Sequence, residues 1–179
     1  MENQISKMEK QANRQKIMEG VLCVVTCGSE ILLIKRAKPP YVGLYSLPGG
    51  KIEFAEHPSK AALREVKEET GLDCKFEKLL GVLSEVLTNE KNEKKHFLMY
   101  VCELTALSRN FVQCDEGELR WVKESEWQAF KPHVIQSDWQ IVKELLFEKH
   151  SKSELREVEM HVKQKNGKEE YAMKEYKAA

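Results

Sequence analysis

Three glutamates that lie close together in the sequence could hold a metal ion. Glu65, Glu68 and Glu69 belong to a stretch whose apolar spacing predicts a helix over 58–70. At about 100° per residue, the three carboxylates share one arc of that helix, beside an arc of apolar side chains. Carboxylates that stay ionised at such close range favour a hard divalent cation, Mg²⁺ or Mn²⁺. A solvent-exposed acidic helix face is the alternative that this pattern leaves open.

The residues around these glutamates follow a fixed spacing. Gly50 is followed by five residues, Glu56, seven residues and the run REVKEETGL (64–72). This spacing resembles the Nudix box, G-x5-E-x7-R-E-U-x-E-E-x-G-U with U apolar, at every fixed position. The preceding segment GLYSLPGG (43–50) is similar to the family's G-x-W-x-x-P-G-G lead-in, with Tyr45 in place of the usual Trp.

The resemblance to Nudix hydrolases, which covers roughly residues 20–147, implies a fold and a reaction. The implied fold is an α/β/α sandwich around a mixed β-sheet, so an α/β protein is expected. The implied reaction is hydrolysis of a nucleoside diphosphate linked to another moiety, with Mg²⁺ or Mn²⁺ as the cofactor. The metal would neutralise the pyrophosphate and lower the pKa of the attacking water.

The resemblance also implies roles for single residues. The expected metal ligands are the carbonyl of Gly49 and the carboxylates of Glu56, Glu65, Glu68 and Glu69. Glu68 would bind the metal directly or through water and so take part in catalysis, whereas Glu56 would support the metal from further away. Arg64 would complete the catalytic set by orienting Glu68 or Glu56 rather than by touching the substrate.

A glutamate on a later loop could take the proton of the attacking water. The segment DEGELRW (115–121) resembles the E-G-x-x-(G)-E-W segment of MutT-like members. Glu116 is the expected base or late metal ligand, Glu118 is the second candidate, and Glu103 is the third. An ordinary acidic turn before a strand is the alternative reading of this segment.

Basic and aromatic residues near the box could bind the substrate. Lys35 and Arg36 end a predicted strand close to the box loop and could contact anionic oxygens, although an exposed strand end is the alternative. Tyr45 joins them in the expected substrate-binding set. The aromatic side chains that could stack on a nucleobase, or pack in the core instead, are Tyr41, Tyr45, Phe97 and Trp121.

The sequence narrows the choice of substrate only through the subfamily signatures that it lacks. The segment VLTN (86–89) lacks the proline or tyrosine expected of ADP-ribose and diadenosine-polyphosphate hydrolases, and KPPY (38–41) lacks the second arginine of the coenzyme A pattern. A (deoxy)nucleoside triphosphate, cleaved to the monophosphate and pyrophosphate, is therefore the expected substrate. An ADP-ribose or nucleotide-sugar pyrophosphatase is the alternative. A Nudix-fold module that binds a nucleotide without cleaving it is a further one.

Several strands and a second helix must position these residues. Apolar runs predict strands over 20–26, 31–36, 74–88, 96–107 and 118–122. The first two strands are expected to form a hairpin, and residues 37–50 a loop because of their Pro and Gly content. Apolar residues at helical spacing predict a helix over 137–150, with Ser137 or Asp138 as its N-cap.

The C-terminal segment 151–179 is expected to form a β-hairpin over about 155–176, because Asn166-Gly167 is a strong hairpin turn signal. The register set by a two-residue turn pairs Val162 with Tyr171, Met160 with Met173, Glu159 with Lys174, and Lys163 with Glu170. Apolar side chains and opposite charges then face one another. Because a lone hairpin is marginally stable, it is expected to pack on the domain or in a homodimer. A solvated charged tail is the alternative.

Length and composition fit one cytoplasmic domain, and the resemblance implies a small nucleotide as its partner. The chain has 179 residues, and its 29 Lys and Arg balance 29 Asp and Glu, which argues against nucleic acid as a partner. No apolar run is long enough for a membrane span, no secretory signal is read, and the five cysteines follow no disulfide framework. The expected organisation is a polar leader over 1–19, helical or disordered, a domain over 20–150 and the hairpin extension.

Overall fold

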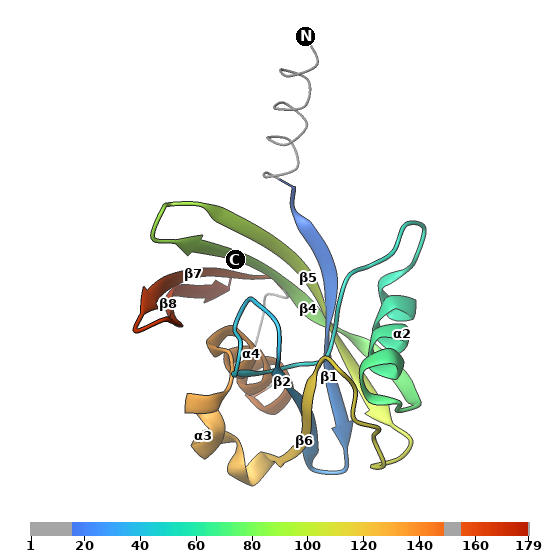
Figure 1. Ribbon diagram of the computed structural model, residues 1–179. Helices are drawn as coiled ribbons and strands as arrows, with labels where there is room; N and C mark the ends of the chain where they lie inside the picture. Colours follow the sequence, from blue (N-terminus) through green and yellow to red (C-terminus); the bar gives the residue numbers. More distant parts are fainter. Residues whose placement is uncertain (1–15, 149–154, 179) are drawn as a thin grey trace.

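The computed structural model describes residues 16–148 and 155–178. The expected leader over 1–19 and the expected helix over 137–150 therefore lie partly outside the described residues. Within these ranges, one β-sheet has helices on both of its faces (Figure 1). None of the helices in these ranges is long and apolar enough to cross a membrane.

The sheet is mixed, as predicted. Its strands are β1 (Met18–Cys27), β2 (Glu30–Arg36), β3 (Tyr45–Ser46), β4 (Cys74–Asn89), β5 (Lys94–Ala106), β6 (Gly117–Lys123), β7 (Leu155–Lys165) and β8 (Lys168–Ala178). Their order is β3-β2-β1-β5-β4-β7-β8, and β6 pairs with β2. β1 runs parallel to β5 and β4 parallel to β7, while the other pairs are antiparallel. The β1–β2 hairpin is thereby confirmed, and β3 is a short strand inside the expected loop.

Helices cover the two faces of the sheet. They are α2 (Pro58–Thr70), α3 (Trp127–Phe130) and α4 (Gln136–Ile141), with the short helical turns η1 (Glu124–Glu126) and η2 (Lys131–His133) and the π-helix η3 (Val142–Glu148). Figure 1 shows α2 on one side of β1, and α3 and α4 on the other. Val66 of α2 packs in one apolar cluster and Trp139 of α4 in a second. This arrangement confirms the expected α/β/α sandwich.

Helix α2 begins and ends for identifiable reasons. Pro58 stands in its first turn, where the missing N–H of proline is not needed and its fixed φ suits the helix. Gly71 ends the helix in the left-handed conformation, with φ 71°, and its N–H donates to the carbonyl of Lys67 at 2.9 Å. The side chains that α2 buries against the sheet are Ala61, Ala62, Val66 and Thr70. The glutamates consequently lie on the arc that the sheet does not cover.

The predicted N-cap of the second helix is wrong. Helix α4 begins at Gln136 with Ile135 as its N-cap, so Ser137 and Asp138 lie inside the first turn and are buried. The carboxylate of Asp138 accepts the N–H of Leu47 at 2.8 Å instead of capping its own helix. A tertiary hydrogen bond has replaced the local one that the sequence pattern suggests.

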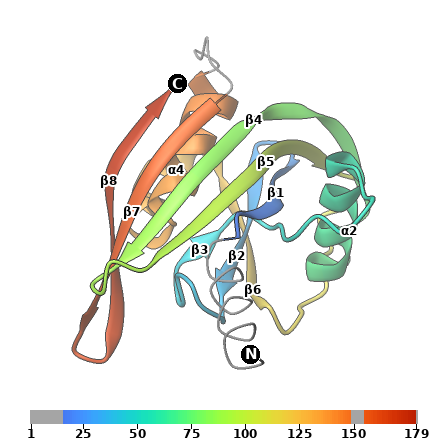
Figure 2. The ribbon, with the colours of Figure 1, turned by 90° about the horizontal axis from the view of Figure 1, so that it is seen from above.

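The C-terminal hairpin forms where the sequence predicts it. The predicted pairs Val162 with Tyr171, Met160 with Met173 and Lys163 with Glu170 are confirmed. β7 also pairs in parallel with β4, from Leu155 opposite Val82 to Val162 opposite Asn89. Figure 2 shows β7 beside β4, and β8 beyond β7 at the edge of the sheet. The hairpin thus packs on the domain, and the expected homodimer stays a prediction that a mass measurement in solution checks.

One predicted pair in the hairpin is wrong. Glu159 lies opposite Glu175 rather than Lys174, because the register shifts by one residue between Glu159 and Met160. Such a bulge adds a residue to one strand and bends it. Its consequence is that Tyr176 stands opposite the buried Val158, where an unbroken register would have put a glutamate.

The packing of the hairpin predicts that it unfolds together with the domain. Met160 is 1% exposed, so Met160→Ala should lower the free energy of unfolding by about 2–5 kcal/mol through the cavity it leaves. Met173→Ala is the matched control, since this cross-strand partner is only half-buried and should cost clearly less. Urea unfolding followed by tryptophan fluorescence measures both. An M160A variant as stable as the wild type would show that the hairpin is not part of the cooperative core.

Candidate active site

Arg64 binds three of the carboxylates singled out by the sequence. Its Nε and Nη2 donate to the two oxygens of Glu56 at 2.9 and 2.8 Å, a bidentate pair. Its Nη1 donates to Glu65 at 2.8 Å and to Glu68 at 3.2 Å. The hydrogen bonds from Arg64 lower the pKa of Glu56 to about 2. Arg64 therefore contacts both of the carboxylates that it was expected to orient.

Glu69 is held by backbone rather than by a cation. Its carboxylate accepts the N–H of Gly49 at 3.0 Å. Burial raises the pKa of Glu69 to about 7, and the negative charges of Glu65 and Glu116 add to the rise. Gly50 packs so tightly on Glu65 that a Cβ at this position would overlap the carboxylate. The glycine pair thus brings the loop into direct contact with both glutamates.

The atoms around α2 that could bind a metal are of the type that a hard divalent cation prefers. All of them are oxygen atoms, and the repulsion between Glu65 and Glu69 is one that a cation would relieve. Glu68 is mostly exposed and directs its carboxylate at Arg64. In the part of the chain that the structure describes, no three His, Cys, Asp or Glu side chains already form a metal site. The expected ligand set therefore remains a prediction.

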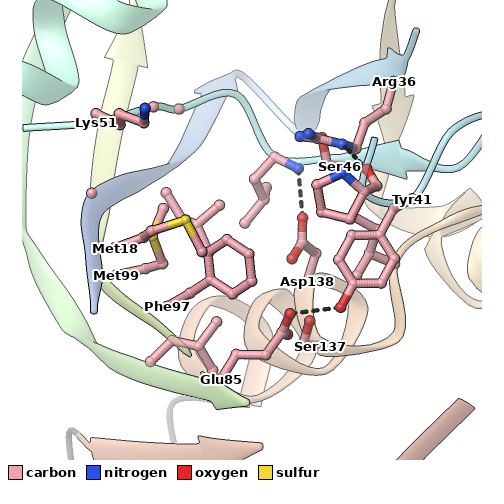
Figure 3. A pocket seen from close by; sticks show the side chains of 18 of the residues that line it. Met18, Arg36, Tyr41, Ser46, Lys51, Glu85, Phe97, Met99, Ser137 and Asp138 are labelled. Carbon is pink, nitrogen blue, oxygen red and sulfur yellow. Dashed lines mark hydrogen bonds between the residues drawn. The ribbon is translucent and has the colours of Figure 1, made fainter. Parts of the chain in front are cut away.

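A cavity of about 250 Å³ (Figure 3) is reached from the glutamate cluster through the loop that precedes α2. Gly49 and Gly50 line it, so one loop borders both the cavity and the carboxylates of α2. Its apolar wall includes Met18, Phe97 and Met99. Its polar wall includes Arg36, Tyr41, Glu85, Ser137 and Asp138. An apolar slot with a few convergent polar groups is the usual form of a small-molecule site.

Two carboxyl groups line this cavity although little solvent reaches them. Glu85 is 5% exposed and Asp138 is 3% exposed. The hydroxyl of Tyr41 donates to Glu85 at 2.6 Å, and the N–H of Leu47 donates to Asp138 at 2.8 Å (Figure 3). Burial raises the pKa of both carboxyls, that of Asp138 to about 7. Near neutral pH, Asp138 is therefore partly protonated and able to accept or to donate a hydrogen bond.

Of the three expected substrate-binding residues, the structure places one in the cavity wall and two outside it. Arg36 lines the cavity, but Lys35 and Tyr45 are not among its lining residues. The hydroxyl of Tyr45 donates to Glu118 at 3.3 Å, and Nζ of Lys35 lies 4.0 Å from the same carboxylate. The ring of Tyr45 packs on Phe130 with the centroids 5.2 Å apart. Tyr45 is therefore a core residue in this structure, the alternative that the sequence left open.

Two of the three candidate bases, Glu116 and Glu103, are each paired with a lysine. Nζ of Lys38 donates to Glu116 at 2.6 Å, and the charge of Glu116 contributes to the raised pKa of Glu69. Glu103 forms an ion pair at 3.5 Å with Lys78 of the neighbouring strand. Of these two, Glu116 is the one whose charge contributes to the raised pKa of a box carboxylate.

Sequence reasoning missed the acidic wall of the cavity. Glu85 lies in β4, where period-two alternation puts it on the same face as the buried Leu83 and Leu87. A carboxylate in an otherwise apolar register was a usable signal. Asp138 was interpreted as a helix cap, and its real partner lies 91 residues away in the chain. No local pattern reports such a contact.

The fold and the box have counterparts in known proteins. A family model described as NUDIX domain matches residues 16–145. The chain is 35% identical over 95 residues to an ADP-ribose pyrophosphatase from Methanocaldococcus jannaschii, which covers 53% of this chain and 54% of that relative. It is 49% identical over 53 residues to an 8-oxo-dGDP phosphatase from Homo sapiens, and that match covers 30% of this chain and 16% of the human protein. The matches thus span about half or less of these curated relatives.

A solved structure matches more completely. The crystal structure of the mutator MutT protein from Bacillus halodurans aligns with a TM-score of 0.65 and 26% sequence identity. The alignment covers 88% of this chain and 98% of that chain. Most of the sandwich seen here therefore has a structural counterpart.

The raised pKa of Asp138 predicts a pH dependence of stability. An unfolded aspartate has a pKa of 3.8, so between about pH 4 and 7 the folded state binds more protons and stability falls as pH rises. Asp138→Asn keeps an acceptor for the Leu47 N–H and removes the titration. From about pH 5 to 8, the wild type should lose on the order of 1 kcal/mol of unfolding free energy relative to D138N. Urea unfolding at several pH values measures this, and parallel profiles would contradict it.

Proposed function

The chain belongs to the Nudix family, and we propose that it is a pyrophosphohydrolase that uses Mg²⁺ or Mn²⁺ to cleave a nucleoside diphosphate derivative. The proposed substrate is a (deoxy)nucleoside triphosphate, cleaved to the monophosphate and pyrophosphate. The observation that carries this proposal is the position of Gly49 and Gly50. They line the cavity and also contact Glu69 and Glu65, so a base in the cavity would leave its phosphates beside the carboxylates.

The proposed metal site uses the oxygen donors of the box. Glu65, Glu69 and the Gly49 carbonyl would hold the cation, with Glu68 as a further ligand, direct or through water. A divalent ion bound there supplies charge neutralisation for the pyrophosphate and a water of lowered pKa. Arg64 keeps Glu65 and Glu68 in place through its hydrogen bonds, and its bidentate pair with Glu56 fixes the guanidinium itself.

The proton of the attacking water would go to Glu116. Its carboxylate lies close enough to Glu69 to affect that residue's pKa, and Lys38 keeps it oriented. Glu118 is the second candidate, although its carboxylate contacts Tyr45 and Lys35. Arg36 at the cavity wall would contact an anionic oxygen of the substrate, as general charge complementarity favours.

The walls of the cavity fit a nucleobase with several N–H donors. Phe97 and Met99 offer an apolar surface for the ring, and the carboxyls of Glu85 and Asp138 offer buried acceptors. Guanine presents a ring N–H next to an amino group, whereas adenine presents only an amino group on its pairing edge. Each carboxyl already accepts a hydrogen bond, from the Tyr41 hydroxyl or the Leu47 N–H, and has further lone pairs for donors of a ligand, so a guanine-type base is favoured.

Of two other candidate functions, one is supported by a specific observation and the other is opposed by one. The archaeal relative is an ADP-ribose pyrophosphatase, which supports a nucleotide-sugar substrate for this chain. A binding module that does not cleave its ligand would need none of the acidic residues, yet Glu56, Glu65, Glu68 and Glu69 are all present. The presence of these carboxylates favours the enzyme.

Removal of one box carboxylate should separate catalysis from folding. We expect Glu69→Gln to lower kcat by about 10²–10³-fold in Mg²⁺, because the variant loses a charged ligand while a side-chain oxygen can still accept the Gly49 N–H. Asp73→Asn is the matched control, since it removes an exposed carboxylate that forms a surface ion pair with Lys67. Its kcat should stay within about twofold. Full activity of E69Q would remove the metal role of Glu69.

A panel of nucleotides tests the substrate. With Mg²⁺, kcat/KM for dGTP should exceed that for dATP, dCTP and dTTP by about tenfold, the scale of one or two matched hydrogen bonds. Chromatography of the products also distinguishes release of pyrophosphate from release of phosphate. If ADP-ribose is cleaved faster than any triphosphate, ADP-ribose becomes the assigned substrate. If no compound is cleaved in Mg²⁺ or in Mn²⁺, the proposal that the protein is an enzyme is wrong.

A further inference from the structure

Tyr41 forms the wall between the cavity and the C-terminal hairpin. It lines the cavity and also a second hollow of about 620 Å³, which Met160 and Tyr171 of the hairpin line from the other side. Its side chain is 5% exposed, and its hydroxyl donates to Glu85. Any displacement of Tyr41 would therefore move the cavity wall and a hydrogen-bonding partner of Glu85 together.

The hairpin holds Tyr41 through one side chain. The N–H of Tyr41 donates to the hydroxyl oxygen of Tyr171 at 2.8 Å, and the two rings pack with centroids 4.2 Å apart. The Tyr171 hydroxyl donates its own proton to Glu169, which leaves an oxygen lone pair directed at the amide. Tyr171 thus contacts Tyr41 by both a polar and an aromatic interaction.

The backbone of Tyr41 needs such contacts. Its φ is 68°, in the left-handed region that an aromatic residue rarely adopts. Conformations of this kind persist when surrounding interactions specify them. On its carbonyl side, Tyr41 accepts the N–H of Leu44 at 3.1 Å, and on its amide side the partner is Tyr171. The hairpin therefore supplies one of the two backbone bonds that hold this residue.

The hairpin is itself anchored to the elements that carry the rest of the polar wall. β7 pairs with β4, and Val158 stands beside Glu85 in that register. The N–H of Met173 donates to the side chain of Gln136, the first residue of α4, at 2.7 Å. The hairpin is thus fixed to β4 and α4 and can position Tyr41 relative to both.

From these contacts we propose that the C-terminal hairpin is part of the substrate site. Tyr171 is a positioning residue that holds Tyr41, and through it Glu85, in the arrangement that binds the nucleotide. The identity of the ligand rests on the proposed function, whereas the positioning of Tyr41 does not. Loss of the Tyr171 hydroxyl should weaken substrate binding without changing the chemical step, because Tyr171 touches no reacting group.

Tyr171→Phe tests the positioning directly, since it removes the oxygen that accepts the Tyr41 N–H and keeps the ring. Tyr176→Phe is the matched control: it removes a hydroxyl from the same strand, but one that donates to Glu144 at 3.2 Å and lines neither hollow. Amide hydrogen exchange measured by NMR should be at least about fivefold faster at Tyr41 in Y171F and unchanged in Y176F. Unchanged exchange at Tyr41 in Y171F would overturn the inference.

Steady-state kinetics on the best substrate of the panel test the consequence. In Y171F, KM should rise about two- to tenfold, as loss of one neutral hydrogen bond predicts, with kcat within about twofold. Y176F should keep both constants even where its melting temperature falls as far as that of Y171F. An unchanged KM in Y171F would show that Tyr171 does not affect substrate binding, and it would leave the proposed enzymatic function untouched. If the wild type cleaves no nucleotide, the proposed function fails and amide exchange alone decides the inference.

Discussion

The close contact of segment 47–50 with three neighbouring elements is the constraint on which the site depends. The segment binds α4 through Asp138, α2 through Glu69, and β1 through the N–H of Val21, which donates to Gly50 at 2.8 Å. A Cβ at Gly49, where φ is 151°, would overlap the carbonyl of Val21. Only glycine allows this approach. Because the sheet lies between α2 and α4, the segment is what connects the glutamate cluster on one side to the cavity on the other.

Negative charge is distributed unevenly around that segment. Arg64 neutralises Glu56 and binds Glu65 and Glu68, while Glu69 has a backbone N–H and no cation within hydrogen-bonding distance in the described structure. Burial and like charges therefore raise the pKa of Glu69, and a bound divalent ion would reverse that effect. The zero net charge of the whole chain thus conceals a concentrated acidic site.

The hairpin extends the fold beyond the part that the family model matches. That match ends at residue 145, whereas β7 and β8 lie within 155–178 and continue the central sheet. Its bulge puts Tyr176 over the core, and Tyr171 near its tip reaches the loop that carries Tyr41. An edge of the sheet that would otherwise end at β4 is thereby covered, and one wall of the cavity gains support from outside the matched region.

Local pattern predicted what depends on local geometry. The helix over 58–70, the strands and the hairpin tip follow from helical and strand periodicity and from the Asn-Gly turn, and the structure has each of them. The mixed order of the sheet was expected from the resemblance to Nudix hydrolases, and the structure has it too. The roles expected of Glu69 and Arg64 came from the resemblance of the box spacing to the Nudix pattern.

Tertiary structure decided the features that join distant segments. Asp138 bonds Leu47 rather than capping α4, Glu85 binds Tyr41, and Lys174 occupies a bulge instead of facing Glu159. Periodicity says which face a side chain takes, but not which remote group meets it there. The box and its acidic helix were therefore determined by the sequence alone. The cavity was decided only when folding brought β4, α4 and the loop before α2 together, because its walls exist only through contacts between residues far apart in the chain.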